Sequence, residues 1–567
     1  MSDNSKSPAN RGKTAINSLA DAYVARLVQI SPITAIELGM RCADESLDDL
    51  SPDGLAARHE LVSETVAALV TARSSGRPDD VARDVMLERL RLEIDRYESG
   101  WAHANLNVIA SPVQMVRMVF DLMPTGTPAE LRTFARRMRA VPAALTGYAQ
   151  SLLHAADRGK VAAVRQVDKC AQQCAAFAGG PDVSGYFSTT VPGFTTDPEL
   201  AAELTAAAVV AEGAYMRLGR FLTQELRPRA PAKDAVGVER YVLASRDFLG
   251  ATVDLERTYG WGWQEFLTIE AELRQVAGRI VPGGTPRDAA AALDADPAYV
   301  VKGIQGLRAW MQDLSDRALA ELGRTHFDIP EQIRELECLI APPGGNLGAY
   351  YTAPSDDLSR PGRMWWSIAP GRDEFTRWRE TTVVYHEGVP GHHLQLATAV
   401  LQRNRLNDFQ RLLAGTSGHA EGWALYAERL VRELGYLRDD GDLLGMLDSQ
   451  LFRAARVVLD IGMHLELPIP LGTGFHEGET WTPELGLEFL LTRTLNEPAN
   501  SRDEIDRYLG WPGQAPSYKV GERIWIECRK AARERSGASF DEKAFHSQAL
   551  SLGGMGLDQL RTELSLL

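Results

Sequence analysis

The sequence predicts a mainly α-helical protein with a small β element. From residue 16 onward, apolar residues recur at three- and four-residue spacing, which is the period of an amphipathic helix. The segments with this pattern are 16–39, 54–74, 81–98, 128–157, 198–226, 262–279 and 304–322. Short apolar or aromatic runs, which are typical of strands, occur at 338–341, 349–351 and 364–368. Helical spacing resumes at Phe375 and continues to the C-terminus.

Local signals support this order of elements. In Thr127-Pro128 and Asp197-Pro198 a capping residue precedes a proline at the first helical position. We expect the polar segment 1–15 to be disordered.

The change in sequence pattern near residue 335 suggests two halves. We expect residues 16–335 to form an N-terminal helical lobe. Residues 336–567 would form the half with the small sheet and a metal site, and the two could also be one continuous domain.

Composition narrows the functional classes. The 567 residues include 61 Lys or Arg and 76 Asp or Glu, which gives a net charge of −15. This acidic balance argues against nucleic acid as a partner and weakens any case for an anionic membrane surface. No stretch approaches the roughly 20 apolar residues of a membrane span. Five scattered cysteines form no disulfide framework, so we expect a reducing, cytoplasmic location.

The densest group of zinc-type ligands lies at residues 385–395. His386, His392 and His393 accompany Glu387 there. In the familiar zinc-hydrolase motif, two histidines four residues apart share one helix face and the intervening glutamate is the general base. Here the fourth residue after His386 is Pro390.

A straight helix cannot bring these histidines to one ion. Six residues rotate His392 off the face of His386, and seven residues place His393 about 10.5 Å along the axis. Pro390 and Gly391 predict a kink or widened turn that absorbs the extra residues. The sequence does not decide between His392 and His393. The alternative is that these histidines are ordinary helix-end residues with no role in metal binding.

A third ligand is offered downstream by Glu421, since a catalytic zinc commonly takes two histidines and a glutamate and leaves one position for water. Glu421 and Glu428 are seven residues apart and share a helix face that is otherwise apolar. A carboxylate on a buried face is costly unless it is paired or bound to a metal. By itself, Glu421 could equally be part of a salt bridge.

These motifs resemble a known bacterial family. The stretches 386–395 and 421–428, with supporting matches at 453–464 and 512–522, are similar to domain of unknown function 885, whose members are grouped with gluzincin-type metallopeptidases. The resemblance implies a large two-lobed helical fold with a zinc-hydrolase site in a deep cleft. It also implies that His386, one of His392 or His393, and Glu421 hold zinc, with Glu387 as the base.

Other candidates surround this group. Arg456, Asp460 and His464 recur every fourth residue along one helix; they could orient a ligand imidazole or form a simple ion-paired stripe. Tyr518 could donate to the oxyanion of a tetrahedral intermediate or merely cap its loop. Lys519 could meet a peptide carboxylate or lie on a solvated face.

The sequence therefore predicts a zinc-dependent hydrolase of peptide or related amide bonds. Zinc would polarise the carbonyl and acidify a water molecule whose proton Glu387 takes. A metal-dependent C–N hydrolase or lyase of a small metabolite is an alternative, as is a helical binding protein with a structural metal. The substrate, the exo- or endopeptidase mode and the oligomeric state are not fixed by the sequence.

Overall fold

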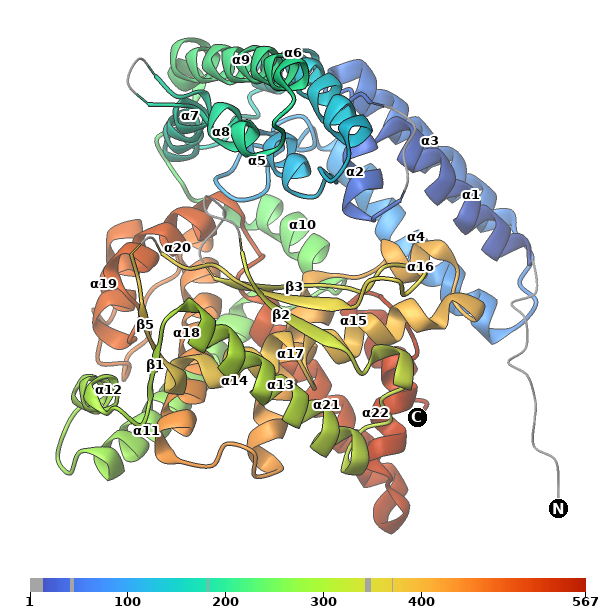
Figure 1. Cartoon of the computed structure of the whole chain (residues 1–567). Helices are drawn as coiled ribbons and strands as arrows, with labels where there is room; N and C mark the ends of the chain where they lie inside the picture. Colours follow the sequence, from blue (N-terminus) through green and yellow to red (C-terminus); the bar gives the residue numbers. More distant parts are fainter. Residues whose placement is uncertain (1–13, 41–44, 181–182, 342–347, 370) are drawn as a thin grey trace. The chain divides into compact units, whose positions relative to one another are not determined.

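The protein is mainly helical, and its strands are few and short (Figure 1). The computed structural model describes residues 14–40, 45–180, 183–341, 348–369 and 371–567. Most of the predicted disordered segment 1–15 lies outside these residues; Thr14 already caps the first helix, which begins at Ala15. No helix in the described part of the chain combines the length and apolar character that a membrane span requires. The predicted fold class is confirmed.

The chain forms two compact units. One comprises residues 14–236 together with Asp503–Trp511, and the other comprises Gly237–Arg502 and Pro512–Leu567. The change in sequence pattern near residue 335 thus falls inside the second unit. The predicted division into lobes of residues 16–335 and 336–567 stays a prediction. The deep cleft implied by the family resemblance also stays a prediction.

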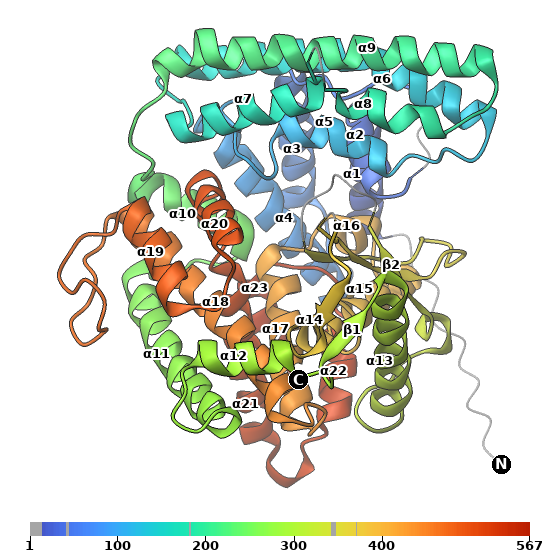
Figure 2. The ribbon, with the colours of Figure 1, turned by 60° about the vertical axis from the view of Figure 1, so that its left-hand side comes forward.

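The unit that begins at residue 14 is an all-helical body. Its helices are α1 (Ala15–Ile30), α2 (Pro32–Glu37), α3 (Pro52–Thr71), α4 (Arg77–Glu98), α5 (Pro112–Met118), α6 (Pro128–Ala156), α7 (Val164–Ala178), α8 (Tyr186–Thr190) and α9 (Pro198–Phe221), with most of α20 (Pro498–Gly510). The long helices α6 and α9 lie side by side (Figure 2). Buried Phe134, Phe187 and Tyr215 contribute to the core beneath them.

Helix starts in this unit follow the predicted chemistry. The Thr127 hydroxyl accepts the backbone N–H of Glu130, and the Glu130 carboxylate accepts the N–H of Thr127, which is a complete capping box. The predicted helix 16–39 is instead two helices, because Ser31 caps a new helix at Pro32, whose ring cannot donate a backbone hydrogen bond.

The second unit holds the remaining helices and all five strands of the described chain. Its helices are α10 (Gly237–Leu249), α11 (Leu255–Ile280), α12 (Pro286–Ala295), α13 (Ile304–Thr325), α14 (Arg377–Glu387), α15 (His392–Leu401), α16 (Asp408–Leu412), α17 (Ser417–Glu433), α18 (Asp440–Leu465), α19 (Pro483–Arg493), α21 (Ser517–Ser536), α22 (Glu542–Leu550) and α23 (Leu557–Leu564). The strands are β1 (Val300–Lys302), β2 (Leu336–Ile340), β3 (Ala349–Thr352), β4 (Gly362–Trp366) and β5 (Glu374–Thr376).

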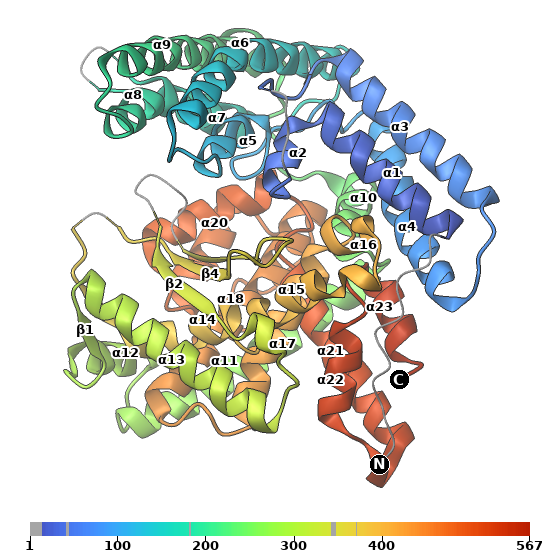
Figure 3. The ribbon, with the colours of Figure 1, turned by 45° about the vertical axis from the view of Figure 1, so that its right-hand side comes forward.

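The three predicted strands form one small sheet. Its order is β2-β4-β3, with β2 parallel and β3 antiparallel to β4. The sheet packs against α13, α14 and α15 (Figure 3). The two-stranded ribbon of β1 and β5 was not predicted, because three-residue strands carry too little alternation to be recognised.

Candidate metal centre

The histidine motif spans the end of one helix and the start of the next. α14 ends at Glu387 and α15 begins at His392. The sequence predicted a kink within one helix, whereas the structure has two helices joined by a turn. Gly391 permits this break: a Cβ atom built there would lie 1.9 Å from the carbonyl oxygen of His386. The chain can therefore fold back tightly and bring His392 beside His386, which a straight helix forbids.

α17 fixes this turn from the opposite side. The indole N–H of Trp423 donates to the carbonyl oxygens of Pro390 and Gly391, at 2.8 and 3.1 Å. The neighbouring Gly422 lies so close to Gly521 of α21 that a Cβ would lie 2.4 Å from its backbone. Glu421 is thus carried on a tightly packed helix that also holds the turn.

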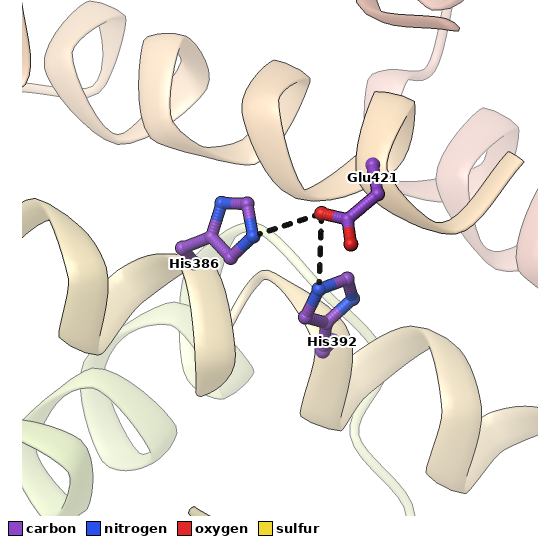
Figure 4. A group of neighbouring side chains, drawn as sticks. All are labelled: His386, His392 and Glu421. Atoms are coloured by element: carbon purple, nitrogen blue, oxygen red, sulfur yellow. Dashed lines mark hydrogen bonds and ion pairs between the residues drawn. The ribbon is translucent and has the colours of Figure 1, made fainter. Parts of the chain in front are cut away.

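The three side chains point toward one another (Figure 4). Oε2 of Glu421 lies 3.2 Å from Nε2 of His386 and 3.6 Å from Nε2 of His392. The two imidazole rings are nearly perpendicular, and one ligand atom from each of the three residues falls within 4.8 Å of the others.

These distances suit a zinc ion. Ligand atoms about 2.0–2.1 Å from a tetrahedral zinc are separated by roughly 3.3 Å, close to the two separations found here. Two imidazoles and one carboxylate are also a common ligand set for catalytic zinc. Among the described residues the group offers three protein donors, whereas structural zinc sites are usually closed by four.

Glu428 is the second partner of His386. Its Oε1 atom lies 2.7 Å from Nδ1 of His386, so the ring donates to Glu428 and directs Nε2 toward Glu421. Burial opposes a proton on His386, but the carboxylates of Glu421 and Glu428 raise its pKa to about 10. The same negative surroundings would attract a metal cation.

A chain of hydrogen bonds continues behind Glu428. Its Oε2 accepts from Thr382 at 2.9 Å and from the amide of Gln450 at 3.4 Å. The oxygen of Gln450 in turn accepts from Lys519 at 2.9 Å. Carboxylates and their own partners orient metal-binding histidines in this way. The sequence placed Glu428 on the face of Glu421 but gave it no role; its seven-residue spacing from Glu421 was the available signal.

Glu387 follows His386 directly and is 5% exposed. Burial raises its pKa, against the opposing charges of His392, His386 and Arg453. Its Oε2 atom is buried and has no hydrogen-bond partner among the described residues. A carboxylate with a raised pKa and an uncommitted oxygen is suited to accept a proton.

The structure places His393 outside this group, contrary to its candidacy as a ligand. Its Nε2 lies 2.8 Å from the carbonyl oxygen of Ile333, and its Nδ1 lies 2.8 Å from the hydroxyl of Tyr351. Both ring nitrogens are thereby used, since Nε2 donates and Nδ1 accepts. The tight turn before α15 gives His392 the position beside His386.

Lys519 does not face solvent, and its position argues against the predicted contact with a peptide carboxylate. It is fully buried, forms ion pairs with Glu265 and Glu522, and donates to Gln450. Its place is therefore in the hydrogen-bond chain that ends at His386.

The stripe on α18 forms a separate buried cluster. Asp460 accepts from the hydroxyl of Tyr241 at 2.5 Å and from the backbone N–H of Gly513 at 2.8 Å, and His464 lies 4.0 Å from it. Arg456 stacks on the rings of Phe452 and Tyr518. The sequence suggested that this stripe could orient a ligand imidazole. In the structure the residue that contacts the imidazole of His386 in this way is Glu428.

Tyr518 is the second residue of α21 and is half-buried. Its ring lies 4.6 Å from the Arg456 guanidinium. Its role as an oxyanion donor stays a prediction.

The family of the chain follows from its sequence. A model of the family described as "Bacterial protein of unknown function (DUF885)" matches residues 32–564. The chain belongs to the DUF885 family. This confirms the resemblance found in the motifs, and both motif stretches lie inside the matched region. A search of curated proteins found no match.

Two solved structures share the fold of this DUF885 chain. A "putative lipoprotein" from Colwellia psychrerythraea is 21% identical, with a TM-score of 0.84 and coverage of 97% of this chain and 98% of the other. A "putative lipoprotein of unknown function" from Shewanella oneidensis is 18% identical, with a TM-score of 0.70 and coverage of 97% and 100%. At these identities the likeness concerns the fold alone.

Proposed function

We propose that the protein is a zinc-dependent hydrolase of peptide or related amide bonds. The observation that carries the proposal is the convergence of His386, His392 and Glu421 within 4.8 Å beside a buried glutamate, Glu387. The proposal includes a relationship between this chain and the gluzincin-type metallopeptidases.

Each residue has a task in this reaction. His386, His392 and Glu421 would hold the metal, and Glu428 keeps His386 in the orientation that presents Nε2. A bound zinc ion supplies an electrophile for the carbonyl and acidifies a water molecule. Glu387, which is buried next to His386, would take a proton from the attacking water and pass it to the leaving amine. Tyr518 is proposed to donate to the oxyanion.

The number of protein donors favours a catalytic site over a purely structural one. Three protein donors in the described group leave the fourth position of a tetrahedral zinc ion for water, as in catalytic sites. A binding protein with a structural metal would be expected to fill that position with a fourth protein ligand. The second alternative, a metabolite-specific C–N hydrolase or lyase, would use the same residues on another bond.

The proposal is tested with purified protein loaded with zinc. We expect about one zinc ion per chain and cleavage of members of a peptide library. Glu387→Gln should keep the metal and lose about 10²–10⁴-fold in kcat. Absence of stoichiometric metal, or full activity in Glu387→Gln, would contradict the proposal, and cleavage of small amides alone would favour the metabolite enzyme.

We further propose that the protein works in the cytoplasm. The described cysteines, Cys170, Cys174, Cys338 and Cys528, are buried and unpaired, as is common in reducing compartments. The two solved structures described as lipoproteins suggest the contrary location. Fractionation of cells that express the native chain tests this: recovery with the membrane or periplasm would contradict it.

A further inference from the structure

The second unit contains a cavity of about 300 Å³ where α14 packs against α13 and α18. Its walls come from these three helices and from the loop that precedes α18. The volume is at the lower end of the range for sites that bind small molecules.

The cavity is separate from the candidate metal centre, although α14 contributes to both. Thr381 and Tyr385 lie one turn apart on α14 and line the cavity. Thr382 and His386 occupy the adjacent face of the helix and contact Glu428. None of the three proposed zinc ligands is among the residues that line the cavity.

A buried carboxylate, that of Asp442, faces the cavity. Asp442 is 6% exposed and accepts a hydrogen bond from the hydroxyl of Thr381 at 2.9 Å. Burial and the charge of Asp439 raise the pKa of Asp442 to about 6, against the hydrogen bond from Thr381 and the charges of Arg377 and Arg438. A cationic group of a ligand would offset the cost of burying this carboxylate.

Tyr385 directs a second polar group into the cavity. It is 4% exposed, and its hydroxyl has no hydrogen-bond partner among the described residues. Burial raises the pKa of Tyr385 to about 12, and the charges that act on its hydroxyl are those of Asp442, Arg317, Arg438 and Glu321. All four of these residues line the cavity. A buried hydroxyl normally has a partner, and a ligand can supply one here.

Cationic side chains lie at the solvent side of the cavity. Arg438 is exposed, and its ion pair with Glu321 is 3.9 Å long, which exceeds the length of a hydrogen bond. Arg317 and Arg377 also line the cavity, and each is paired with an aspartate. The cavity thus offers an acid in its interior and a guanidinium at its edge.

We infer that this cavity binds a free amino acid with an apolar side chain. The ammonium group of the ligand meets Asp442, its carboxylate meets Arg438, and its side chain packs against Trp310, Leu314 and Ala318 of α13. Hydrogen bonds between charged groups are strong, and a guanidinium matches both oxygens of a carboxylate. The inference goes beyond the proposed hydrolase function and requires neither zinc nor turnover.

The test is calorimetry with the full chain in zinc-loaded and in chelator-treated form. We expect L-leucine to bind equally well to both forms, because no proposed zinc ligand lines the cavity. N-acetyl-L-leucine lacks the ammonium charge and L-leucinamide lacks the carboxylate. Each should bind roughly 10–100-fold more weakly, as is typical for loss of a hydrogen bond between charged groups.

Paired variants locate the ligand. Asp442→Asn keeps an acceptor for Thr381 and should remove the preference for L-leucine over its N-acetyl derivative. Arg438→Gln should remove the preference for L-leucine over L-leucinamide, and its exposed position makes a folding defect unnecessary to consider. Asp440→Asn is the matched control, because Asp440 is paired with Arg279 and does not line the cavity; all three affinities should stay unchanged.

The inference is overturned if L-leucine does not bind at millimolar concentration, if its two derivatives bind as tightly as L-leucine, or if either variant keeps the preference that it should remove. Binding to the zinc-loaded form alone also overturns it, because the ligand would then lie at the metal centre. Failure of the hydrolase proposal is seen separately, as missing metal or missing cleavage of peptides.

Discussion

The second unit contains two buried clusters of histidine and acid that use the same residue types in different ways. Around His386, His392 and Glu421, three donor atoms converge on one another. On α18, the carboxylate of Asp460 is instead engaged by the hydroxyl of Tyr241 and the N–H of Gly513. Burial of histidine and acid is thus common to both clusters, and only the convergence of donor atoms around His386 supports the proposed metal site.

Removal of a direct ligand should produce the largest effect. Glu421→Ala takes away one of three donors, so zinc affinity should fall by more than the roughly 10–100-fold expected for loss of an outer partner. Zinc content after dialysis measures this. His476→Ala is the matched control, because His476 also contacts two glutamates but its side chain is 33% exposed. Equal loss of zinc in both variants would break the distinction.

Loss of the outer carboxylate should produce the next effect. Glu428→Gln replaces the strong acceptor of the His386 N–H, and we expect zinc affinity to fall about 10–100-fold with the fold intact. Competition with a zinc-binding dye gives the affinity, and circular dichroism gives the fold. Unchanged affinity would show that Glu428 does not orient the ligand.

A substitution in the α18 cluster should lower the stability of the fold and leave zinc affinity unchanged. Asp460→Ala leaves the Tyr241 hydroxyl and the Gly513 N–H without their acceptor, so the free energy of unfolding should fall by about 1–3 kcal/mol for each group left unpaired. Zinc affinity should stay unchanged. Chemical denaturation and zinc titration report the two quantities; a loss of zinc without a loss of stability would reverse the comparison.

Another buried histidine, His546, predicts an effect on the pH dependence of stability. Burial lowers the pKa of His546 to about 3, and its Nε2 lies 2.6 Å from the hydroxyl of Tyr426. The unfolded chain takes up a proton near pH 6.5 and the folded chain does not, so stability should fall as pH drops from about 6.5 toward 3.

The slope of this loss is at most about 1.4 kcal/mol per pH unit from this group. Denaturation at several pH values measures it in the wild type and in His546→Phe. The variant should be less stable at pH 7, because the Tyr426 hydroxyl loses its partner, and should lose less stability on acidification. Identical pH slopes would contradict the buried neutral histidine.

Much of the fold and part of the site follow from local patterns in the sequence. Helical spacing and capping residues such as Thr127 predict most helices, and the motif names His386 and Glu421. The choice between His392 and His393 does not follow, because it depends on a tight turn that tertiary contacts of Trp423 stabilise.

The role of Lys519 shows the same limit of sequence analysis. A lysine beside a loop resembles a surface residue until α18 and α11 bring Gln450 and Glu265 against it. The partners of Glu428 and Asp460 likewise come from distant segments. Long-range contacts decide which polar residues are engaged, and spacing along the chain does not encode them.

The most direct test of the central claim is anomalous diffraction at the zinc edge from crystals of the zinc-loaded protein. We predict one strong peak among Nε2 of His386, Nε2 of His392 and Oε2 of Glu421. No peak there, or a peak beside Asp460 and His464 instead, would contradict the account.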